Sequence, residues 1–212
     1  MHITVFGAAG SVGSRVVAEA LSRGHEVTAA VRDPARAAAL PPAVRVRTGD
    51  AGDPDDVAAL SEGQDLVISA VRPPAGRESE LAVTTAAVLE GVARAGVRVL
   101  VVSGAGSLTV PGAGGATVAE GADFPPDWRP IARACDAQLA VCRADTAADW
   151  ACLSPAALLR PGTRTGRYRL GADELVVGAD GSSSLSLEDL AVVLLDEAEK
   201  PRHRQVRFTA GY

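Results

Sequence analysis

Short apolar runs alternate with amphipathic helical patterns along almost the whole chain, and this alternation restricts the fold more than any other feature. Runs typical of buried strands occur at residues 3–6, 26–31, 44–47, 66–70, 97–102, 150–153 and 205–208, with a further candidate at 174–177. Helical patterns lie between them, at residues 13–23, 34–40, 54–62, 79–95, 129–145 and 187–199. This order predicts parallel strands joined by right-handed crossovers, with helices on both faces. We therefore expect an α/β fold with a doubly wound parallel sheet.

A glycine-rich turn joins the first predicted strand to the first predicted helix. Its sequence, Gly-Ala-Ala-Gly-Ser-Val-Gly, places glycine at positions 7, 10 and 13. Glycine permits a tight turn and lets the backbone approach a pyrophosphate, while the following helix directs unpaired N–H groups at the anion. The turn therefore predicts a dinucleotide site and a Rossmann-like sheet. The residues expected to bind the cofactor here are Gly7, Ala9, Gly10, Ser11, Val12 and Gly13.

The residues that end the second predicted strand bear on which nicotinamide cofactor fits. Arg32 lies at this position, and its guanidinium can bind the 2′-phosphate of NADP through two hydrogen bonds. We therefore expect NADP(H) to be preferred over NAD(H). The neighbouring Asp33 is an alternative partner for the ribose hydroxyls of NAD(H). After the third strand, Asp50 either accepts a hydrogen bond from the adenine amine or forms a local Asx turn.

The carboxyl ends of the next three predicted strands carry mostly small and polar residues. Parallel strands end at one edge of the sheet, and ligands bind at that edge. We expect ribose and nicotinamide to lie there. Pro155 has no N–H to donate, whereas the N–H of Ala156 can donate to the nicotinamide carboxamide. The predicted contacts are Ala70, Val71, Arg72, Ser103, Gly104, Ser154, Pro155 and Ala156.

The chain has 212 residues, a length that suits one domain, and no segment has the composition of a linker. We expect residues 1–212 to form one nucleotide-binding domain with a small C-terminal substrate lobe. Residues 104–128 and 160–180 show little periodicity, and long loops of this kind usually carry function, so both are predicted to lie on the substrate side. Phe124 and Trp128 either cover a planar substrate or pack within the first of these loops.

The sequence has one lysine, Lys200, and two tyrosines, Tyr168 and Tyr212. Neither tyrosine is followed four residues later by lysine, which excludes the tyrosine–lysine pair of many carbonyl reductases. Hydride transfer to a flavin requires alignment of the two rings and little proton transfer. The candidate catalytic residues for this limited role are Ser103, Ser154 and Tyr168, and the Ser103 hydroxyl alternatively holds the nicotinamide amide or a backbone group.

Charge and cysteine content exclude several kinds of partner. A formal net charge of -5 and few aromatic residues argue against nucleic acid, and the absence of an apolar run of roughly 18 residues argues against a membrane span. Cys135, Cys142 and Cys152 lack the spacing of metal ligands, so we expect buried reduced thiols, no metal and a cytoplasmic protein. The expected partner is a small planar molecule, and the chain is expected to be a monomer or a homodimer.

Several further motifs, in order along the chain, resemble one known family. They are DWACLSPA at 149–156, PGTRTGRYR at 161–169, SLSLEDLA at 184–191, EKPRH at 199–203 and RFT at 207–209. Together with the glycine turn and Arg32-Asp33-Pro34, they resemble the NAD(P)H-binding, NmrA-like branch of the atypical short-chain dehydrogenases. Within that branch, the similarity is greatest to the NADH-flavin reductases and extends to biliverdin reductase B. The resemblance covers essentially the whole chain.

The resemblance implies an NADPH-dependent oxidoreductase that transfers a hydride to a flavin or another planar acceptor. Other members of the branch imply two alternatives: a non-catalytic regulator that binds NADP(H) to sense redox state, and a ketoreductase or isomerase of secondary metabolism. The chain departs from the family's pattern at two positions. Ala9 replaces a threonine in the glycine turn, which removes a hydroxyl that can hold phosphate and predicts weaker cofactor binding. Leu190 replaces a tyrosine in the last helix.

Overall fold

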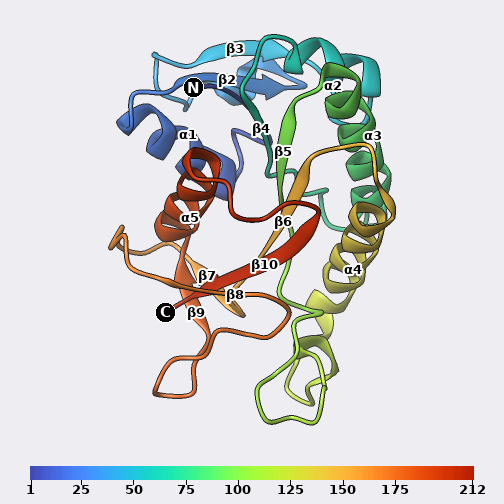
Figure 1. The fold of residues 1–212 in the computed structure, drawn as a ribbon, viewed down its shortest axis with the longest axis vertical. Helices are drawn as coiled ribbons and strands as arrows, with labels where there is room; N and C mark the ends of the chain where they lie inside the picture. The colour runs from blue at the N-terminus through green and yellow to red at the C-terminus, as the bar shows by residue number, and fades with distance from the viewer.

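The computed structural model describes residues 1–212, whose strands and helices alternate along the chain (Figure 1). The strands are β1 (His2–Phe6), β2 (Glu26–Val31), β3 (Arg45–Thr48), β4 (Leu66–Ser69), β5 (Arg98–Val102), β6 (Trp150–Pro155), β7 (Leu158–Arg160), β8 (Arg169–Gly171), β9 (Ser184–Ser186) and β10 (Val206–Gly211). The α-helices are α1 (Ser11–Ser22), α2 (Pro54–Ser61), α3 (Glu80–Ala95), α4 (Arg129–Ala144) and α5 (Leu187–Glu199). Short 3₁₀ helices are η1 (Pro34–Ala37), η2 (Val118–Glu120) and η3 (Pro126–Trp128).

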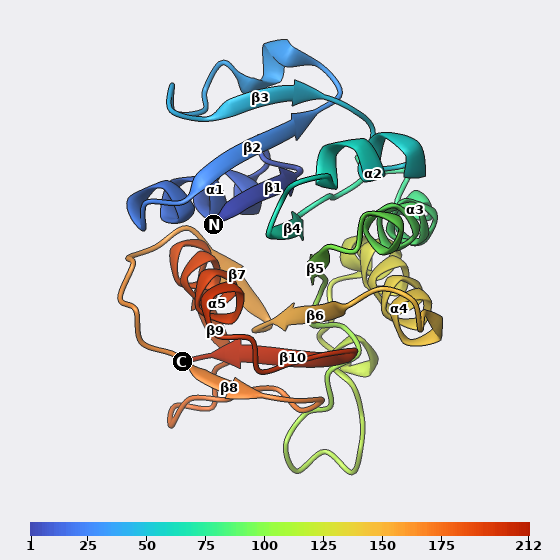
Figure 2. The ribbon, with the colours of Figure 1, turned by 45° about the horizontal axis from the view of Figure 1, so that its top comes forward.

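Eight strands form one sheet in the order β3-β2-β1-β4-β5-β6-β10-β8, and β7 pairs separately with β9. All neighbours in the large sheet run parallel except β8, which is antiparallel to β10. From β1 the chain adds strands first toward β3 and then, after β4, in the opposite direction (Figure 2). The doubly wound sheet predicted from the sequence is confirmed, and its switch point lies between β1 and β4, where such sheets bind ligands.

Helices cover both faces of the sheet, as Figure 2 shows. Helices α1 and α5 pack together on one face, where Val16 and Leu194 belong to a core cluster of 24 buried residues. Helices α2, α3 and α4 cover the other face, where Val57 and Val88 belong to a cluster of 17. Since both faces are buried, most residues of the central strands are apolar on both faces of the sheet. None of the helices combines the length and the apolar composition needed to cross a membrane.

The segment 104–128 contains more ordered structure than its sequence indicates. Thr109 forms β-bridges to both Thr117 and Glu174, so the segment folds back on itself and joins the C-terminal part of the chain. The Thr117 hydroxyl and the Glu120 carboxylate form a capping box that begins η2. The candidate strand at 174–177 is reduced to this one bridge, and the helix expected at 34–40 is the single turn η1. The sequence pattern predicted both elements to be longer than they are. The strand depends on one bridge to a distant residue, and the helical turn depends on one cap.

Candidate functional site

The glycine turn leaves no room for a side chain at two of its positions. Gly7 has a φ of 77°, and a Cβ on it would lie 2.4 Å from the Ala70 carbonyl oxygen. A Cβ on Gly13 would lie 2.1 Å from the Gly7 carbonyl oxygen. The N–H of Gly10 donates to that same oxygen at 2.9 Å and closes the turn. Gly7 is therefore held directly against the end of β4, and Gly13 lies directly on the backbone of Gly7.

Helix α1 begins with its first N–H groups unpaired. The first helical hydrogen bond runs from the Ser14 N–H to the Gly10 carbonyl oxygen at 2.9 Å, and no side chain caps the helix. The N–H groups of residues 11–13 thus lack a partner within the helix and carry the partial positive charge of its N-terminus. Together with Ala9 in the turn, they form a backbone surface at the carboxyl edge of the sheet that suits a pyrophosphate.

Arg32 and Asp33 follow β2 and have different surroundings. Asp33 Oδ1 accepts the N–H of Ala35 at 2.9 Å and caps η1, which has Pro34 at its start. The Arg32 side chain is exposed and forms no ion pair. Asp33 is therefore engaged in holding the chain, whereas Arg32 remains available to bind an anion.

Asp50 forms the Asx turn that the sequence left open as one of two interpretations. Its Oδ1 accepts the N–H of Gly52 at 2.9 Å, and its own N–H donates to Asp56 Oδ2 at 2.8 Å. Because Asp56 belongs to α2, these bonds fix the loop after β3 against that helix. The second carboxylate oxygen of Asp50 is the atom left for an adenine amine, and that contact stays a prediction.

The ends of β5, β6 and β10 bring hydroxyl groups side by side. The Ser103 N–H donates to the Leu153 carbonyl oxygen at 2.9 Å, so Ser103 lies next to Ser154. Ser154 is paired in turn with Thr209 of β10. The Ser103 hydroxyl donates to the Cys135 carbonyl oxygen at 3.5 Å, which places this row beneath α4.

The three hydroxyls of this row differ in accessibility. Ser154 and Thr209 are 1% and 0% exposed, whereas Ser103 is half-buried. The Thr209 Oγ1 is buried and has no hydrogen-bond partner. The sequence analysis missed Thr209, although strand alternation places residues 207 and 209 on one face. The structure therefore brings the predicted Ser103 and Ser154 together, adds Thr209, and leaves Ser103 nearest the open edge.

The other predicted contacts also lie along the carboxyl edge. The Ala70 N–H donates to the Phe6 carbonyl oxygen at 3.0 Å, so Ala70, Val71 and the exposed Arg72 follow directly beside the glycine turn. A Cβ on Gly104 would lie 3.0 Å from Cys135 Sγ, which is a close approach to α4. Pro155 ends β6 and the buried Ala156 follows it.

Tyr168 does not lie at this edge, which corrects its prediction as a catalytic residue. Its hydroxyl donates to Asp196 Oδ2 at 2.5 Å. Burial of the ring and the bond to the Asp196 carboxylate raise the pKa of Tyr168 well above its usual range. Helix α5 begins after Ser186 at the carboxyl edge, and Asp196 lies ten residues further along, which is about 15 Å of helix. The Tyr168 hydroxyl is thus turned away from the cofactor edge and is already hydrogen-bonded there.

Part of the segment 160–180, which is predicted to lie on the substrate side, forms a strap across α1 and α5. Arg164 donates from Nε and Nη2 to the Glu19 carboxylate at 2.7 and 2.8 Å. The N–H groups of Thr165 and Gly166 both donate to Asp189 Oδ1 at 2.8 Å, and the Thr165 hydroxyl donates to Asp189 Oδ2 at 2.6 Å. The strap, residues 161–168, is therefore held on the outer surface of the helix pair.

The Asp189 carboxylate is the buried centre of this strap. It is 0% exposed and also accepts the hydroxyl of Tyr212, the last residue, at 2.6 Å. Burial alone would raise the pKa of Asp189, but the hydrogen bonds from Thr165, Tyr212 and Gly166 outweigh it and hold the pKa below its usual range. The Ser186 hydroxyl accepts the Asp189 N–H at 2.9 Å and caps α5.

The aromatic residues beside the 104–128 segment have different freedom. Phe124 is half-buried, and the Arg129 guanidinium lies 5.9 Å from its ring centre. Trp128 is 52% exposed at the start of α4. Trp128 is therefore the aromatic side chain here that is free to cover a planar molecule.

The three cysteines are buried and unpaired, as the sequence predicts. Burial raises the pKa of the Cys135 thiol to about 11. A thiol with so high a pKa is a poor nucleophile at neutral pH. Cys135 therefore belongs to the packing beneath the site, against Gly104, rather than to its chemistry.

Comparison with protein families gives a match over most of the chain. Residues 7–201 match the model of a family described as NAD(P)H-binding. The matched region contains the glycine turn, Arg32 and the ends of the central strands. This breadth agrees with the resemblance seen in the sequence motifs and supports the predicted enzyme class, an NAD(P)H-dependent oxidoreductase.

Individual relatives are similar over their whole length. The uncharacterized protein YwnB of Bacillus subtilis is 34% identical over 212 residues, which span 99% of this chain and 97% of that protein. A solved structure of a candidate epimerase from Bacteroides thetaiotaomicron is 40% identical, with a TM-score of 0.90 and coverage of 100% of this chain and 96% of the other. A candidate NADH-flavin reductase from Streptococcus pneumoniae is 31% identical, with a TM-score of 0.85 and coverage of 100% and 99%.

Proposed function

Because the chain belongs to the NAD(P)H-binding family, we propose that it transfers a hydride from NADPH to a flavin or another planar acceptor. Bound NADPH supplies the hydride, and a flavin takes up that hydride with one proton from water. The protein's part is to hold the two rings in contact and to exclude competing reactions. A relative named as a candidate NADH-flavin reductase, 31% identical to this chain, supports this choice of acceptor.

The observation that carries the proposal is the bare backbone at the start of α1. The N–H groups of residues 11–13 have no capping side chain, Gly7 lets the turn lie against the end of β4, and Gly13 lets the helix start lie against Gly7. An unpaired helix N-terminus at the switch point of a doubly wound sheet favours a dinucleotide pyrophosphate. Ala9 contributes no hydroxyl, so we expect the backbone N–H groups to be the main donors to the pyrophosphate.

The surroundings of Arg32 favour NADPH over NADH. Asp33, the residue that would hold the ribose hydroxyls of NADH, has one of its two carboxylate oxygens engaged by the Ala35 N–H. Arg32 is free to donate two hydrogen bonds to a 2′-phosphate. We expect Asp50 to accept from the adenine amine through its remaining oxygen.

The ends of the central strands are arranged to orient the nicotinamide. We expect Ala70, Val71 and Arg72 to line the ribose beside the glycine turn. We expect Ser103 and Gly104, with Ser154, Pro155 and Ala156 on the next strand, to hold the carboxamide and one face of the ring. Their row is continuous because Ser103 is hydrogen-bonded to β6.

The row of Ser103, Ser154 and their neighbours contains no tyrosine, histidine or carboxylic acid to act as a general acid. This favours a flavin-like acceptor over a ketone. Reduction of a ketone needs a proton donor to the developing alkoxide. Tyr168 cannot serve here, because its hydroxyl is bonded to Asp196 near the C-terminal end of α5. A flavin needs no such donor from the protein. We expect Trp128, which is exposed at the start of α4, to cover the second ring.

Kinetics with several acceptors tests the proposal. NADPH oxidation is followed without oxygen in the presence of riboflavin, FMN or menadione, and NADPH affinity is measured separately. We expect turnover with at least one flavin, faster than with NADH. Tight NADPH binding without turnover of any acceptor would replace the enzyme with a redox-sensing regulator of the NmrA type. Turnover of ketones alone would favour the ketoreductase reading.

A further inference from the structure

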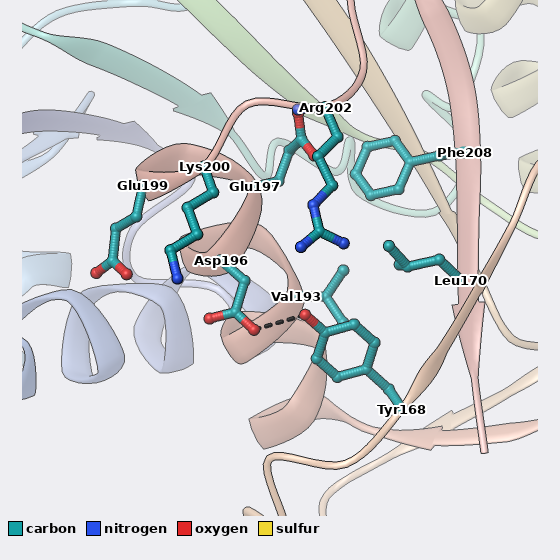
Figure 3. Close-up of a pocket in the computed structure, with 9 residues that line it drawn as sticks. All are labelled: Tyr168, Leu170, Val193, Asp196, Glu197, Glu199, Lys200, Arg202 and Phe208. Carbon is teal, nitrogen blue, oxygen red and sulfur yellow. Dashed lines mark hydrogen bonds between the residues drawn. The ribbon is translucent and has the colours of Figure 1, made fainter.

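A cavity of about 170 Å³ lies on the outer side of α5, between that helix and the strands β8 and β10 (Figure 3). Its walls come from Leu170 of β8, Val193 of α5, Phe208 of β10 and the ring of Tyr168. Acidic and basic side chains from the end of α5 and the turn after it form the rim (Figure 3). This cavity is separated by the length of α5 from the glycine turn, so the proposed hydride transfer does not use it.

The carboxylates at the rim already have their hydrogen bonds. Asp196 accepts from Arg23 through Oδ1 at 2.7 Å and from the Tyr168 hydroxyl through Oδ2 at 2.5 Å. Glu199 accepts from Arg23 at 3.1 Å, and its other oxygen lies 2.9 Å from His25 Nε2. Neither carboxylate has an oxygen without a partner.

The third carboxylate, Glu197, is more fully engaged. It is 4% exposed, and its Oε1 accepts from Arg98 Nη2 at 2.7 Å and from the N–H groups of Arg202 and His203 at 2.9 and 3.0 Å. Its Oε2 lies 2.8 Å from His203 Nδ1. These bonds hold the pKa of Glu197 below its usual range although burial alone would raise it. The rim therefore has no free acceptor.

Two cations at the same rim have no partner. The side chains of Lys200 and Arg202 make neither a hydrogen bond nor an ion pair. Figure 3 shows the Arg202 guanidinium directed into the cavity, whereas the Lys200 ammonium group lies at the rim, toward Asp196 and Glu199. Arg167 lies at the wider mouth of the same hollow. The groups at the cavity that are still free to form hydrogen bonds are therefore cationic donors, although the net charge of the chain is -5.

The floor of the cavity is apolar and rigid. Phe208 is 1% exposed, and its ring is stacked on the His203 ring at 4.3 Å between centres and 5° between planes. Leu170, in contrast, is 38% exposed and presents its side chain at the opening. A cavity of roughly 150 Å³ holds a molecule of the size of benzene. One six-membered ring therefore matches this cavity in size, while the charged residues among its nine lining residues favour a ligand that also carries a charge.

We propose that this cavity is a second ligand site, separate from the cofactor edge, which binds a compact carboxylate with an apolar ring. The ring lies against Leu170 and the Tyr168 ring, above the buried Val193 and Phe208, and the carboxylate accepts hydrogen bonds from Arg202. A guanidinium binds a carboxylate through two parallel bonds, and Lys200 adds a second positive charge. A neutral ring would leave both cations unpaired, and inorganic phosphate would leave the apolar floor uncovered.

Calorimetric titration with benzoate tests the site, since benzoate has one ring and one carboxylate. We expect saturable one-to-one binding with a dissociation constant of about 1 mM. Benzyl alcohol, which has a similar shape and no charge, should show no saturation at the same concentrations. Saturation with NADP⁺ should change the benzoate affinity by less than about twofold, because the two sites do not share residues.

Variants separate the proposal from general charge attraction. Arg202→Met should weaken benzoate at least tenfold, since charge-assisted hydrogen bonds contribute about 1.5–3 kcal/mol. Lys200→Met should weaken it several-fold, and Val193→Phe should block it by filling the floor. Arg133→Met, which removes an exposed cation on α4, is the matched control and should leave binding unchanged.

The same titrations can overturn the site. Absence of saturable benzoate binding to the wild-type chain would do so, as would equal binding by wild type and Arg202→Met. Binding of inorganic phosphate as tightly as benzoate would contradict the apolar part of the proposal. Thermal unfolding of each variant confirms that the folded chain is being titrated.

Discussion

The carboxyl edge of the sheet, where the cofactor is expected, and the surface under the strap differ in whether their polar groups have hydrogen-bond partners. At the edge, the N–H groups of residues 11–13 and the Arg32 side chain have no partner within the chain. On the strap surface, Glu19 and Asp189 are buried and accept hydrogen bonds from several segments at once. Unpaired groups at an open edge can bind an incoming ligand, whereas fully paired buried groups hold the fold together. The cavity beside α5 combines both, with paired carboxylates and unpaired cations.

The largest expected effect is on stability, at the centre of the strap. Asp189→Ala removes the acceptor for the N–H groups of Thr165 and Gly166 and for two hydroxyls. We expect the free energy of unfolding to fall by about 3 kcal/mol or more, measured by urea denaturation. Asp127→Ala, at an exposed position, is the control and should change it by less than about 0.5 kcal/mol. A large loss of NADPH affinity with unchanged stability would reverse the roles assigned to the two regions.

At the cofactor edge, the sharpest comparison uses two glycines with similar backbone. Gly7 and Gly63 have φ of 77° and 70°, but a Cβ meets the Ala70 carbonyl only at Gly7, and nothing lies within 4 Å at Gly63. Both alanine variants incur a similar backbone strain of roughly 1 kcal/mol. Gly7→Ala should in addition weaken NADPH about a hundredfold, since the turn must move, and Gly63→Ala should leave affinity unchanged. Equal affinities in calorimetry would contradict the geometry of the turn.

Cofactor choice should depend on one side chain. Arg32→Ala should weaken NADPH roughly tenfold or more and leave NADH almost unchanged, because only NADPH carries the 2′-phosphate. Arg45→Ala, at an exposed arginine near the start of β3, is the matched control. If the ratio of the two affinities is the same in wild type and Arg32→Ala, Arg32 is not the selecting residue.

The smallest effect is the dependence of stability on pH. Hydrogen bonds with Arg164 and Arg23 hold the pKa of Glu19 below its usual range, and Asp189 and Glu197 are lowered in the same direction. A lowered pKa in the folded chain gives stability that is complete above the unfolded pKa and is lost as pH falls. We expect the free energy of unfolding to be level near neutral pH and to decline below about pH 4.5. Asp189→Asn should make the decline shallower, and an unchanged slope would show that Asp189 does not contribute to it.

The sequence predicted the edge better than the strap for a physical reason. The glycine turn, Ser103 and Ser154 depend on strands and a helix that are contiguous in sequence, and the order of strands places their ends together. The Asp33 cap was not predicted, although an aspartate before proline commonly begins a helical turn. The sequence pattern was sufficient to predict those parts of the site that are formed by backbone groups and strand ends.

The strap depends on contacts between distant residues and could not be read in this way. Arg164 and Glu19 are 145 positions apart, and Tyr168 meets Asp196 across 28 positions. The conformation of the segment between β7 and β8 decides which face these side chains reach. Tyr168 was therefore predicted as a donor at the edge from its residue type alone. Thr209 was missed because its importance lies in its pairing with Ser154.

The most direct test is a crystal structure of the chain with NADP⁺ and a flavin. The pyrophosphate should lie on the N–H groups of residues 11–13, and the 2′-phosphate should contact Arg32. The nicotinamide should lie beside Ser103 and Ser154 with the flavin stacked on its free face, toward Trp128. A nicotinamide ring covered on both faces by protein, or a dinucleotide bound away from the glycine turn, would contradict hydride transfer at this edge.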